Sequence, residues 1–224
     1  MSHGKIIAIE GLDGVGKHTQ AELLAKRLGW QLRSFPTHNG SSFANPVDGY
    51  LNGELSSNPN DVNPYAAAAM YAVDRYASYL TDWGKLYQDG TNFIMDRYME
   101  SNLIYHLGKL QSVNDKKAFC KNVISNEMTM GIPKADIVVF LDVMPEISQK
   151  LMTTRYNGDE SKKDIHESSI EFQRQCRKNA LFAKGECDNW MSIKCFDENA
   201  FSILPIEMIH EIIYDTVSNT INSK

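Results

Sequence analysis

The sequence has few cysteines, and their spacing matches no known cysteine motif. Only four occur among 224 residues, namely Cys120, Cys176, Cys187 and Cys195, and no two of them form a CxxC pair. Structural zinc sites and disulfide frameworks depend on cysteines at characteristic spacings. The spacing therefore indicates neither kind of site and is typical of reduced thiols in a cytosolic protein.

Long apolar segments and an excess of positive charge are also missing. The longest apolar run, YAAAAMYAV, ends at Asp74 and is far shorter than the roughly 20 residues that cross a bilayer. No apolar segment precedes the first predicted strand, so no secretory signal is visible. The formal net charge is −5, which gives no general attraction for nucleic acid. We therefore expect a cytoplasmic protein that binds neither membranes nor nucleic acid.

The sequence does contain a regular alternation of short β-rich runs and long helical patterns. The runs KIIAIE, QLRSF, NFIMD, DIVVFLD and WMSIKC begin at residues 5, 31, 92, 136 and 190. Apolar strands separated by helices are typical of a parallel sheet that is covered on both faces. The length suits one sizeable domain. We therefore predict a single α/β domain over residues 1–224, with a five-stranded parallel sheet flanked by helices on both faces.

Capping residues mark the beginning of two of the predicted helices. Asn63 followed by Pro64 is expected to start a long helix, because proline is favoured at the first helical position. Ser168 with Glu171 forms a capping-box pattern at the start of another helix.

A glycine-rich segment stands between the first predicted strand and the helix after it. Residues 11–17 read GLDGVGK and fit the G-x-x-x-x-G-K pattern in the strand–turn–helix context that this phosphate-binding motif requires. The glycines allow backbone N–H groups to converge, and the helix N-terminus adds partial positive charge. A chance glycine-rich turn is the alternative, but the lysine favours a nucleotide site. The predicted ATP-binding residues are Gly11, Asp13, Gly14, Val15, Gly16, Lys17, His18 and Thr19.

His18 departs from the usual form of this motif. The position after the lysine normally carries a serine or threonine whose hydroxyl oxygen binds Mg²⁺, and imidazole suits this hard cation poorly. Two arrangements stay open: Thr19 takes over as a metal ligand, or substrate phosphates and water hold the metal. Asp96, at the end of its strand, is expected to orient Mg²⁺ through water or to anchor Arg97. We interpret His18 as a helix-start residue rather than a catalytic one.

Two further groups of side chains recur at helical spacing. If a helix follows the strand NFIMD, then Arg97, Ser101 and Tyr105 share one of its faces. This face would lie beside the carboxyl ends of the strands, where open α/β sheets bind ligands. On the preceding long helix, Tyr71 and Arg75 are also four apart and suit a flat base with carbonyl oxygens. The alternatives are a core position for Tyr71 and a surface ion pair within its own helix for Arg75.

These features occur in an order that resembles the thymidylate kinases, which are P-loop kinases that phosphorylate dTMP. The resemblance covers almost the whole chain through IEGLDGVGKHTQ, SFP, YAVDR, DRYMESNLIYH and GIPKADIVVFLDV, which begin at residues 9, 34, 71, 96 and 131. It implies the fold of the nucleoside monophosphate kinases and a homodimer. It also implies Mg²⁺ as cofactor and ATP and dTMP as substrates.

For the nucleoside, the resemblance implies that Tyr71 stacks on thymine and that Arg75 binds the carbonyl edge of the base. Asp13 would contact the 3′-hydroxyl of the deoxyribose, and Tyr105 would disfavour a 2′-hydroxyl. Ser101 would line the base pocket.

For the acceptor phosphate, the resemblance implies that Arg97 holds it and that Phe35 and Pro36 shape its pocket. The family often has an acidic residue and an arginine after this proline. The present chain has Thr37 and His38 there, so the family's phosphate contacts from this loop do not carry over.

A polar segment, TTRYNGDESKKD, begins at residue 153 and is interpreted as part of a lid over about residues 153–166. Gly14 stands where some family members carry an arginine, so the resemblance implies that the lid supplies the catalytic cation. The candidates are Arg155, Lys162 and Lys163, and a solvated surface run is the alternative for the two lysines. A closing lid would add positive charge and exclude water. The predicted catalytic residues are then Lys17, Arg97 and Arg155.

The resulting prediction is transfer of the γ-phosphoryl group of ATP to dTMP, giving dTDP and ADP for dTTP biosynthesis. One alternative is a kinase for another deoxynucleotide or for a deoxynucleoside. Tyr71 replaces the family's usual phenylalanine and His106 stands where glutamine is common, and a nucleoside kinase would need a carboxylate such as Glu10 as its base. The other alternative is a P-loop switch that binds nucleotide without transferring phosphate.

Overall fold

The central sheet has the five strands predicted from the sequence. A computed structural model of the chain describes residues 3–38, 41–159 and 163–222. Its main sheet is entirely parallel, with strand order β2-β3-β1-β4-β5. The strands are β1 (Ile6–Gly11), β2 (Gln31–Ser34), β3 (Phe93–Asp96), β4 (Ile137–Asp142) and β5 (Trp190–Lys194).

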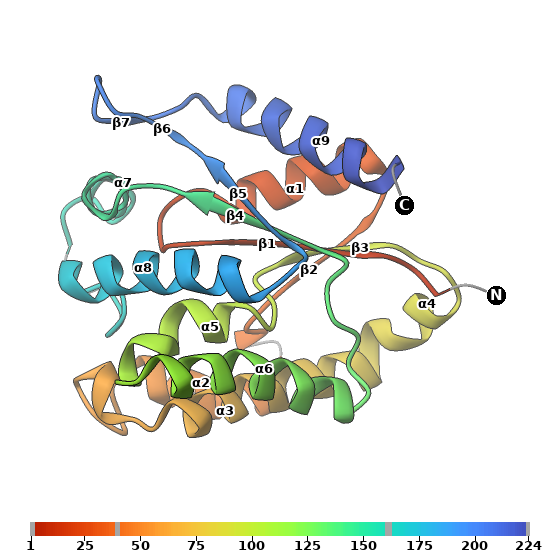
Figure 1. Ribbon diagram of the computed structural model, residues 1–224, viewed down its shortest axis with the longest axis horizontal. Helices are drawn as coiled ribbons and strands as arrows, with labels where there is room; N and C mark the ends of the chain where they lie inside the picture. Colours follow the sequence, from red (N-terminus) through yellow and green to blue (C-terminus); the bar gives the residue numbers. More distant parts are fainter. Residues whose placement is uncertain (1–2, 39–40, 160–162, 223–224) are drawn as a thin grey trace.

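Helices cover both faces of this sheet, as predicted (Figure 1). On one face lie α1 (Lys17–Leu28) and α9 (Ile206–Asn222). The other face carries α5 (Ser101–His106) and α8 (Ile170–Glu186), and an outer layer beyond them is formed by α2 (Asn45–Leu51), α3 (Pro64–Ser78) and α6 (Val113–Thr129). The remaining α-helices are α4 (Gly84–Gln88) and α7 (Pro145–Arg155).

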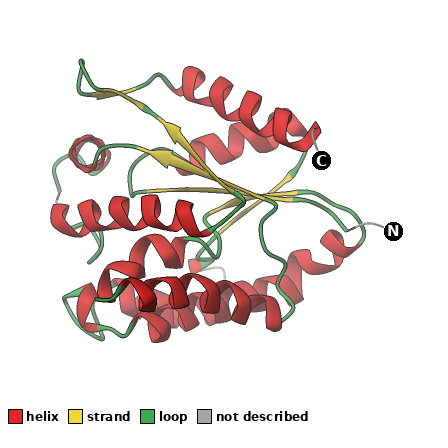
Figure 2. Ribbon diagram, in the orientation of Figure 1, coloured by secondary structure: helices red, strands yellow, loops and turns green. Residues whose placement is uncertain are grey.

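Short elements complete the chain (Figure 2). They are the 3₁₀ turns η2 (Ser42–Ala44), η3 (Pro59–Asp61) and η5 (Leu107–Lys109) and the π-helical turn η4 (Tyr79–Trp83). A small antiparallel hairpin of β6 (Phe196–Asp197) and β7 (Ser202–Ile203) follows β5. The sequence did not predict this hairpin, because strands of two residues are too short to show periodicity.

The strand register brings two loops together at the carboxyl edge of the sheet. β1 and β4 are buried along nearly their whole length, as expected for strands covered on both sides. In the register, Ile9 of β1 pairs with Asp96, the last residue of β3. The chain that leaves β1 therefore runs beside the chain that leaves β3.

One of the two predicted helix starts is confirmed and the other is wrong by one residue. Asn63 caps α3, since its Oδ1 accepts hydrogen bonds from the backbone N–H of Tyr65 at 2.9 Å and of Ala66 at 3.3 Å. The cap of α8 is Ser169, whose Oγ accepts from the Phe172 N–H at 3.2 Å. Ser168 belongs instead to the preceding turn, where its N–H donates to the Asp164 carbonyl.

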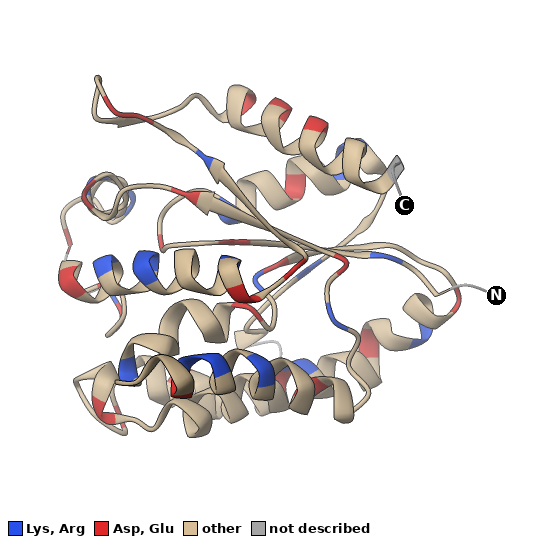
Figure 3. Cartoon of the chain, viewed as in Figure 1, with Lys and Arg blue, Asp and Glu red and all other residues tan. Residues whose placement is uncertain are grey.

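Charged side chains of both signs are scattered over the helices (Figure 3). Within the described ranges 3–38, 41–159 and 163–222, no helix combines the length and the apolar character needed to cross a bilayer.

The substitution Asn63→Ala tests the cap of α3. Loss of the capping oxygen should lower the free energy of unfolding by about 1 kcal/mol, measured by urea denaturation. Asn122→Ala, at an exposed position within α6, is the matched control and should leave stability unchanged or slightly higher, because alanine favours helix. Equal losses in the two variants would contradict the capping role.

Candidate active site

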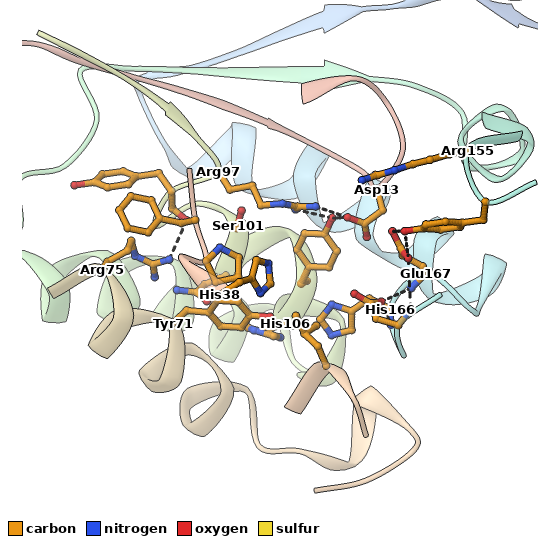
Figure 4. Close-up of a pocket in the computed structure, with 18 residues that line it drawn as sticks. Asp13, His38, Tyr71, Arg75, Arg97, Ser101, His106, Arg155, His166 and Glu167 are labelled. Atoms are coloured by element: carbon orange, nitrogen blue, oxygen red, sulfur yellow. Dashed lines mark hydrogen bonds and ion pairs between the residues drawn. The ribbon is translucent and has the colours of Figure 1, made fainter. Parts of the chain in front are cut away.

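Two adjoining cavities open at the carboxyl edge of the sheet. One, of about 600 Å³, is lined by the glycine-rich loop and by residues such as Lys17, Thr19 and Asp96; we call it the loop cavity. The other, of about 280 Å³, lies among α3, α5 and the chain after α7; we call it the helix cavity (Figure 4). The residues that line both cavities are Asp13, Phe35, Pro36, His38, Arg97, Arg155 and Glu167.

The glycine-rich loop joins β1 to α1, as the motif predicts. Gly14 and Gly16 have positive φ of 74° and 87°, which is the left-handed region that glycine adopts without strain. A Cβ added at Gly14 would also lie 2.5 Å from the side chain of Met152. An arginine at position 14 would therefore be strained and would require the Met152 side chain to move, which agrees with the expectation that a catalytic cation comes from elsewhere.

Lys17 is buried at the start of α1. Its Nζ donates a hydrogen bond to the Leu12 carbonyl at 2.5 Å and lies 3.9 Å from Asp13 Oδ1. Burial lowers the pKa of this amine to about 8, and the nearby positive charge of Arg97 acts in the same direction. The backbone of the glycine-rich loop thus holds the ammonium group of Lys17 inside the loop.

Asp13 is the centre of a buried hydrogen-bond cluster. Its Oδ1 accepts from Arg97 Nη2 and, at 3.0 Å, from the Tyr105 hydroxyl, while Oδ2 accepts from Gln173 Nε2 at 3.0 Å. Arg97 Nη1 also donates to the Tyr105 hydroxyl at 3.0 Å. Burial alone would raise the pKa of Asp13, but the positive charges of Arg97 and Lys17 outweigh it and hold the pKa well below its ordinary value.

Arg97 does not lie on the helix that carries Ser101 and Tyr105, so that prediction is wrong. α5 begins only at Ser101. Arg97 has φ of 65°, and its N–H donates to the Ile9 carbonyl at 3.1 Å, which turns the chain sharply after β3. The turn nevertheless places its guanidinium against Tyr105. The three side chains therefore line one cavity as expected, by a different local structure.

Glu10 is fully buried and is absent from the lining of both cavities. Its carboxylate accepts from the Ser101 hydroxyl and from the Tyr98 N–H, both at 2.7 Å. The structure therefore favours a structural role at the strand end over a catalytic base. Nearby, burial and the charge of Glu10 raise the pKa of Glu100 to about 8.

Arg75 is buried and forms a two-point ion pair with another helix. Its Nε and Nη2 donate to the carboxylate of Glu127 on α6, at 2.7 and 2.5 Å. The alternative of a surface pair within its own helix is therefore wrong. Its Nη1 has only a long contact of 3.4 Å to the Tyr98 carbonyl, and the side chain lines the helix cavity together with Tyr71. The pair fixes the guanidinium while one edge still faces the cavity.

The residues predicted to bind metal lie together at the loop cavity. Asp96 Oδ2 is 2.9 Å from His18 Nδ1 and accepts from the Ser34 hydroxyl at 3.5 Å. The expectation that Asp96 anchors Arg97 is wrong, because the carboxylate partner of Arg97 is Asp13. Over the described parts of the chain, no three His, Cys, Asp or Glu side chains converge on a metal site.

Comparison with known proteins decides the family. A sequence model of the family described as thymidylate kinase matches residues 9–197. The chain belongs to the thymidylate kinase family. A thymidylate kinase of Mycobacterium tuberculosis is 31% identical over 191 residues, which cover 83% of this chain and 87% of the relative. A probable thymidylate kinase of Pyrobaculum aerophilum is 32% identical over 66% of this chain and 70% of its own length.

A solved thymidylate kinase structure supports the fold. The structure from Candida albicans superposes with a TM-score of 0.68 over 100% of this chain and 95% of its own, at 20% identity. At 20% identity, this similarity supports the fold but not a specific function. It agrees with the five-stranded parallel sheet flanked by helices.

The segment predicted to be a lid in this thymidylate kinase family member is described except for residues 160–162. Arg155 is the last residue of α7 rather than part of a loop, and it lines both cavities. Lys163 Nζ donates to Gln149 Oε1 at 3.2 Å and does not line either cavity. Lys162 lies outside the described residues. Of the two predicted lid cations that lie in the described residues, Arg155 lines the cavities and Lys163 does not.

The segment from Asp164 to Gln173 contributes residues that the sequence analysis did not single out. Asp164 Oδ1 accepts from the N–H groups of His166 and Glu167, both at 2.8 Å, and so forms a tight turn. This turn stacks the His166 ring on Tyr105, with centroids 5.2 Å apart. Gln173 Nε2 also donates to the His166 carbonyl at 2.9 Å. The D-x-x-E spacing of residues 164–167 could have predicted this turn from the sequence. The contacts of Gln173 could not be predicted, because they depend on how α8 is rotated about its axis.

The substitution Glu100→Gln should remove a pH-dependent loss of stability. The pKa of Glu100 is about 8 in the folded chain against 4.5 ordinarily, so between these values only the folded state holds the proton. The free energy of unfolding then falls as pH rises, by at most about 1.4 kcal/mol per pH unit.

Urea unfolding from about pH 5 to pH 8 measures this effect. The variant should gain stability relative to the unmodified chain as pH increases, since glutamine stays neutral. Parallel pH curves for the two proteins would contradict the shift.

Proposed function

We propose that this protein transfers the γ-phosphoryl group of ATP to the phosphate of dTMP, giving dTDP and ADP, a step towards dTTP. The observation that supports this most strongly is the pair of adjoining cavities that share Asp13 and Arg97. Because the two cavities share these residues, a donor in one and an acceptor in the other would lie next to each other. Family membership supports the same reaction.

The donor would occupy the loop cavity. Backbone N–H groups of residues 11–19 and the N-terminus of α1 favour a chain of phosphates there. Lys17 supplies a positive charge for the outer phosphates once its contact with the Leu12 carbonyl is exchanged. Positively charged groups around the transferred phosphoryl group stabilise the charge of the transition state.

The acceptor would occupy the helix cavity. Tyr71 and Ser101 line its interior beside Arg75, whose remaining N–H groups suit a base carbonyl. Tyr105 would lie against the sugar, together with Asp13. Phe35 and Pro36 line both cavities, which suits a role around the acceptor phosphate.

Arg97 and Arg155 would hold the phosphates at the junction of the cavities. Both side chains line both cavities, so each can approach the acceptor phosphate and the γ-phosphate. No covalent intermediate and no general base are required if the acceptor phosphate is ionised. The contribution of the protein is to position the reactants and to stabilise charge.

The donor atoms at the loop cavity fit Mg²⁺. Asp96 offers a carboxylate and Thr19 a hydroxyl, and both line the loop cavity. These are oxygen donors, and Mg²⁺ at phosphate sites commonly uses one or two protein ligands with phosphate oxygens and water. When bound, the ion would neutralise charge on the phosphates of ATP.

We also propose that the protein is a cytoplasmic homodimer and that residues 1–224 form one domain with a lid over about residues 153–166. Val73, Tyr76 and Leu80 support the dimer, because these apolar side chains are exposed on α3 and η4. Such a stripe suits contact with a second copy.

Incubation with Mg²⁺-ATP and a panel of acceptors tests the proposed reaction. We expect dTDP to form from dTMP, with little transfer to thymidine or to ribonucleotides. Lys17→Ala should lower kcat/KM for ATP at least about 100-fold while leaving the unfolding transition in place, since a charge-assisted contact at the transferred group is lost.

Preferred transfer to thymidine would instead identify a nucleoside kinase, and slow ATP hydrolysis without any acceptor would identify a nucleotide switch. Near-normal activity of Lys17→Ala would contradict the role given to the loop.

The substitution His18→Ser tests how the metal is held. Serine restores a hydroxyl at this position and releases Asp96 from its contact with the imidazole. The Mg²⁺ concentration for half-maximal activity should therefore fall, by roughly three- to tenfold for one added ligand contact. An inactive variant would show instead that the imidazole itself is required.

A further inference from the structure

His18 places a ring nitrogen beside a carboxylate in the loop cavity. Its Nδ1 lies 2.9 Å from Asp96 Oδ2, and both side chains line this cavity together with Lys17 and Thr19. The histidine side chain is 61% exposed and that of Asp96 is 12% exposed. A solvent-accessible ring thus meets a nearly buried carboxylate at the end of β3, on the wall of the cavity that suits the phosphates of ATP.

The distance between these two atoms suits two different occupants. A proton on Nδ1 makes the contact a hydrogen bond, which is the arrangement expected without nucleotide. An octahedral metal ion with ligands at about 2.1 Å also separates neighbouring ligand atoms by about 3 Å. An ion can therefore replace the proton between His18 Nδ1 and Asp96 Oδ2 with little movement of either side chain.

The other ring nitrogen has a neighbour that suits a metal-bound histidine. His18 Nε2 lies 3.3 Å from Oε1 of Glu22, one turn further along α1. A histidine that binds a metal through one nitrogen commonly donates the N–H of the other to a carboxylate, which fixes the ring and its tautomer. With the proton on Nε2, the lone pair of Nδ1 is free to bind an ion beside Asp96.

The protein supplies too few ligands to hold such an ion alone. Among the described residues, no three His, Cys, Asp or Glu side chains form a group that could hold a metal. At the loop cavity, His18, Thr19 and Asp96 offer one nitrogen and two kinds of oxygen donor. Phosphate oxygens and water would fill the other positions, so tight binding of the ion should require the nucleotide.

We infer that the nucleotide site of this chain selects a divalent transition ion such as Mn²⁺ over Mg²⁺, through a bond to His18 Nδ1. This inference rests on one part of the proposed function, namely that the loop cavity binds the nucleotide. Imidazole is a good ligand for transition ions and a poor one for Mg²⁺. Mg²⁺ would bind the same phosphates with Thr19, Asp96 and water, but without the ring.

Mn²⁺ is the most demanding probe of this selection. Among the first-row divalent transition ions it has the lowest affinity for sites with nitrogen and oxygen ligands, and affinity rises towards Co²⁺ and Ni²⁺. It shares the octahedral oxygen chemistry of Mg²⁺, so Asp96 and the phosphates suit both ions. A difference between the two ions at this site would therefore come from His18.

Pulsed EPR of bound Mn²⁺ tests the bond directly. The protein with Mn²⁺ and ADP should show modulation from a directly bound imidazole nitrogen at about pH 8, where protons compete less with metals for the ring. Labelling of histidine with ¹⁵N should replace the ¹⁴N pattern, and His18→Ser should abolish it. His3→Ser, at an exposed position outside both cavities, is the matched control and should keep the signal.

The metal dependence of dTDP formation tests the selection. For each protein, the Mg²⁺ concentration that gives half-maximal activity is divided by the corresponding Mn²⁺ concentration. This ratio should be about tenfold larger in the unmodified protein than in His18→Ser, and His3→Ser should keep the unmodified value. Comparing ratios between proteins cancels the different affinities of the two ions for free ATP.

Equal ratios in the unmodified protein and His18→Ser would overturn the inference, as would a Mn²⁺–ADP complex without the nitrogen coupling. A protein that does not bind ADP would overturn both the inference and the proposed function. The EPR measurement needs bound ADP but no phosphoryl transfer. Nitrogen coupling from His18 in a protein that forms no dTDP with either ion would therefore overturn the proposed function and support the inference.

Discussion

The ion pair between Asp13 and Arg97 joins the two halves of this site. Asp13 belongs to the loop after β1 and Arg97 to the turn after β3, and the two strands are neighbours in the sheet. Both cavities are lined by the pair, so in the proposed reaction its geometry would set the distance between donor and acceptor. Because the pair is largely buried, loss of either member would leave an uncompensated charge at a cost on the order of 3–5 kcal/mol.

The arginines at this edge of the sheet are held by acidic partners rather than left in solvent. Arg75 is fixed by Glu127 from α6, and Arg97 by Asp13. Buried ion pairs add little net stability, but they orient their members. The raised pKa values of Glu10 and Glu100 beneath the site show that burial of carboxyl groups is itself unfavourable here. Burial of these charged groups thus lowers the stability of the protein, but it positions the guanidinium groups before any ligand binds.

The sequence predicted those features that depend on local pattern. Continuous apolar strands, the phosphate-binding loop and the Asn63 cap follow from residues close together in the chain, and all are present. Family resemblance extended this to the residues of the helix cavity. Features that depend on tertiary contact were missed: the turn that takes Arg97 off α5, the Glu127 partner of Arg75, and Gln173, which reaches Asp13 across 160 residues of chain.

The most direct test of the central claim is a crystal structure of the protein with ADP and dTMP bound together. The arrangement described here predicts the β-phosphate of ADP on the backbone amides of residues 13–17, the base of dTMP beside Tyr71 and Arg75, and the dTMP phosphate within hydrogen-bond distance of Arg97. A nucleotide bound away from these two cavities, or a helix cavity filled by protein side chains when dTMP is present, would contradict it.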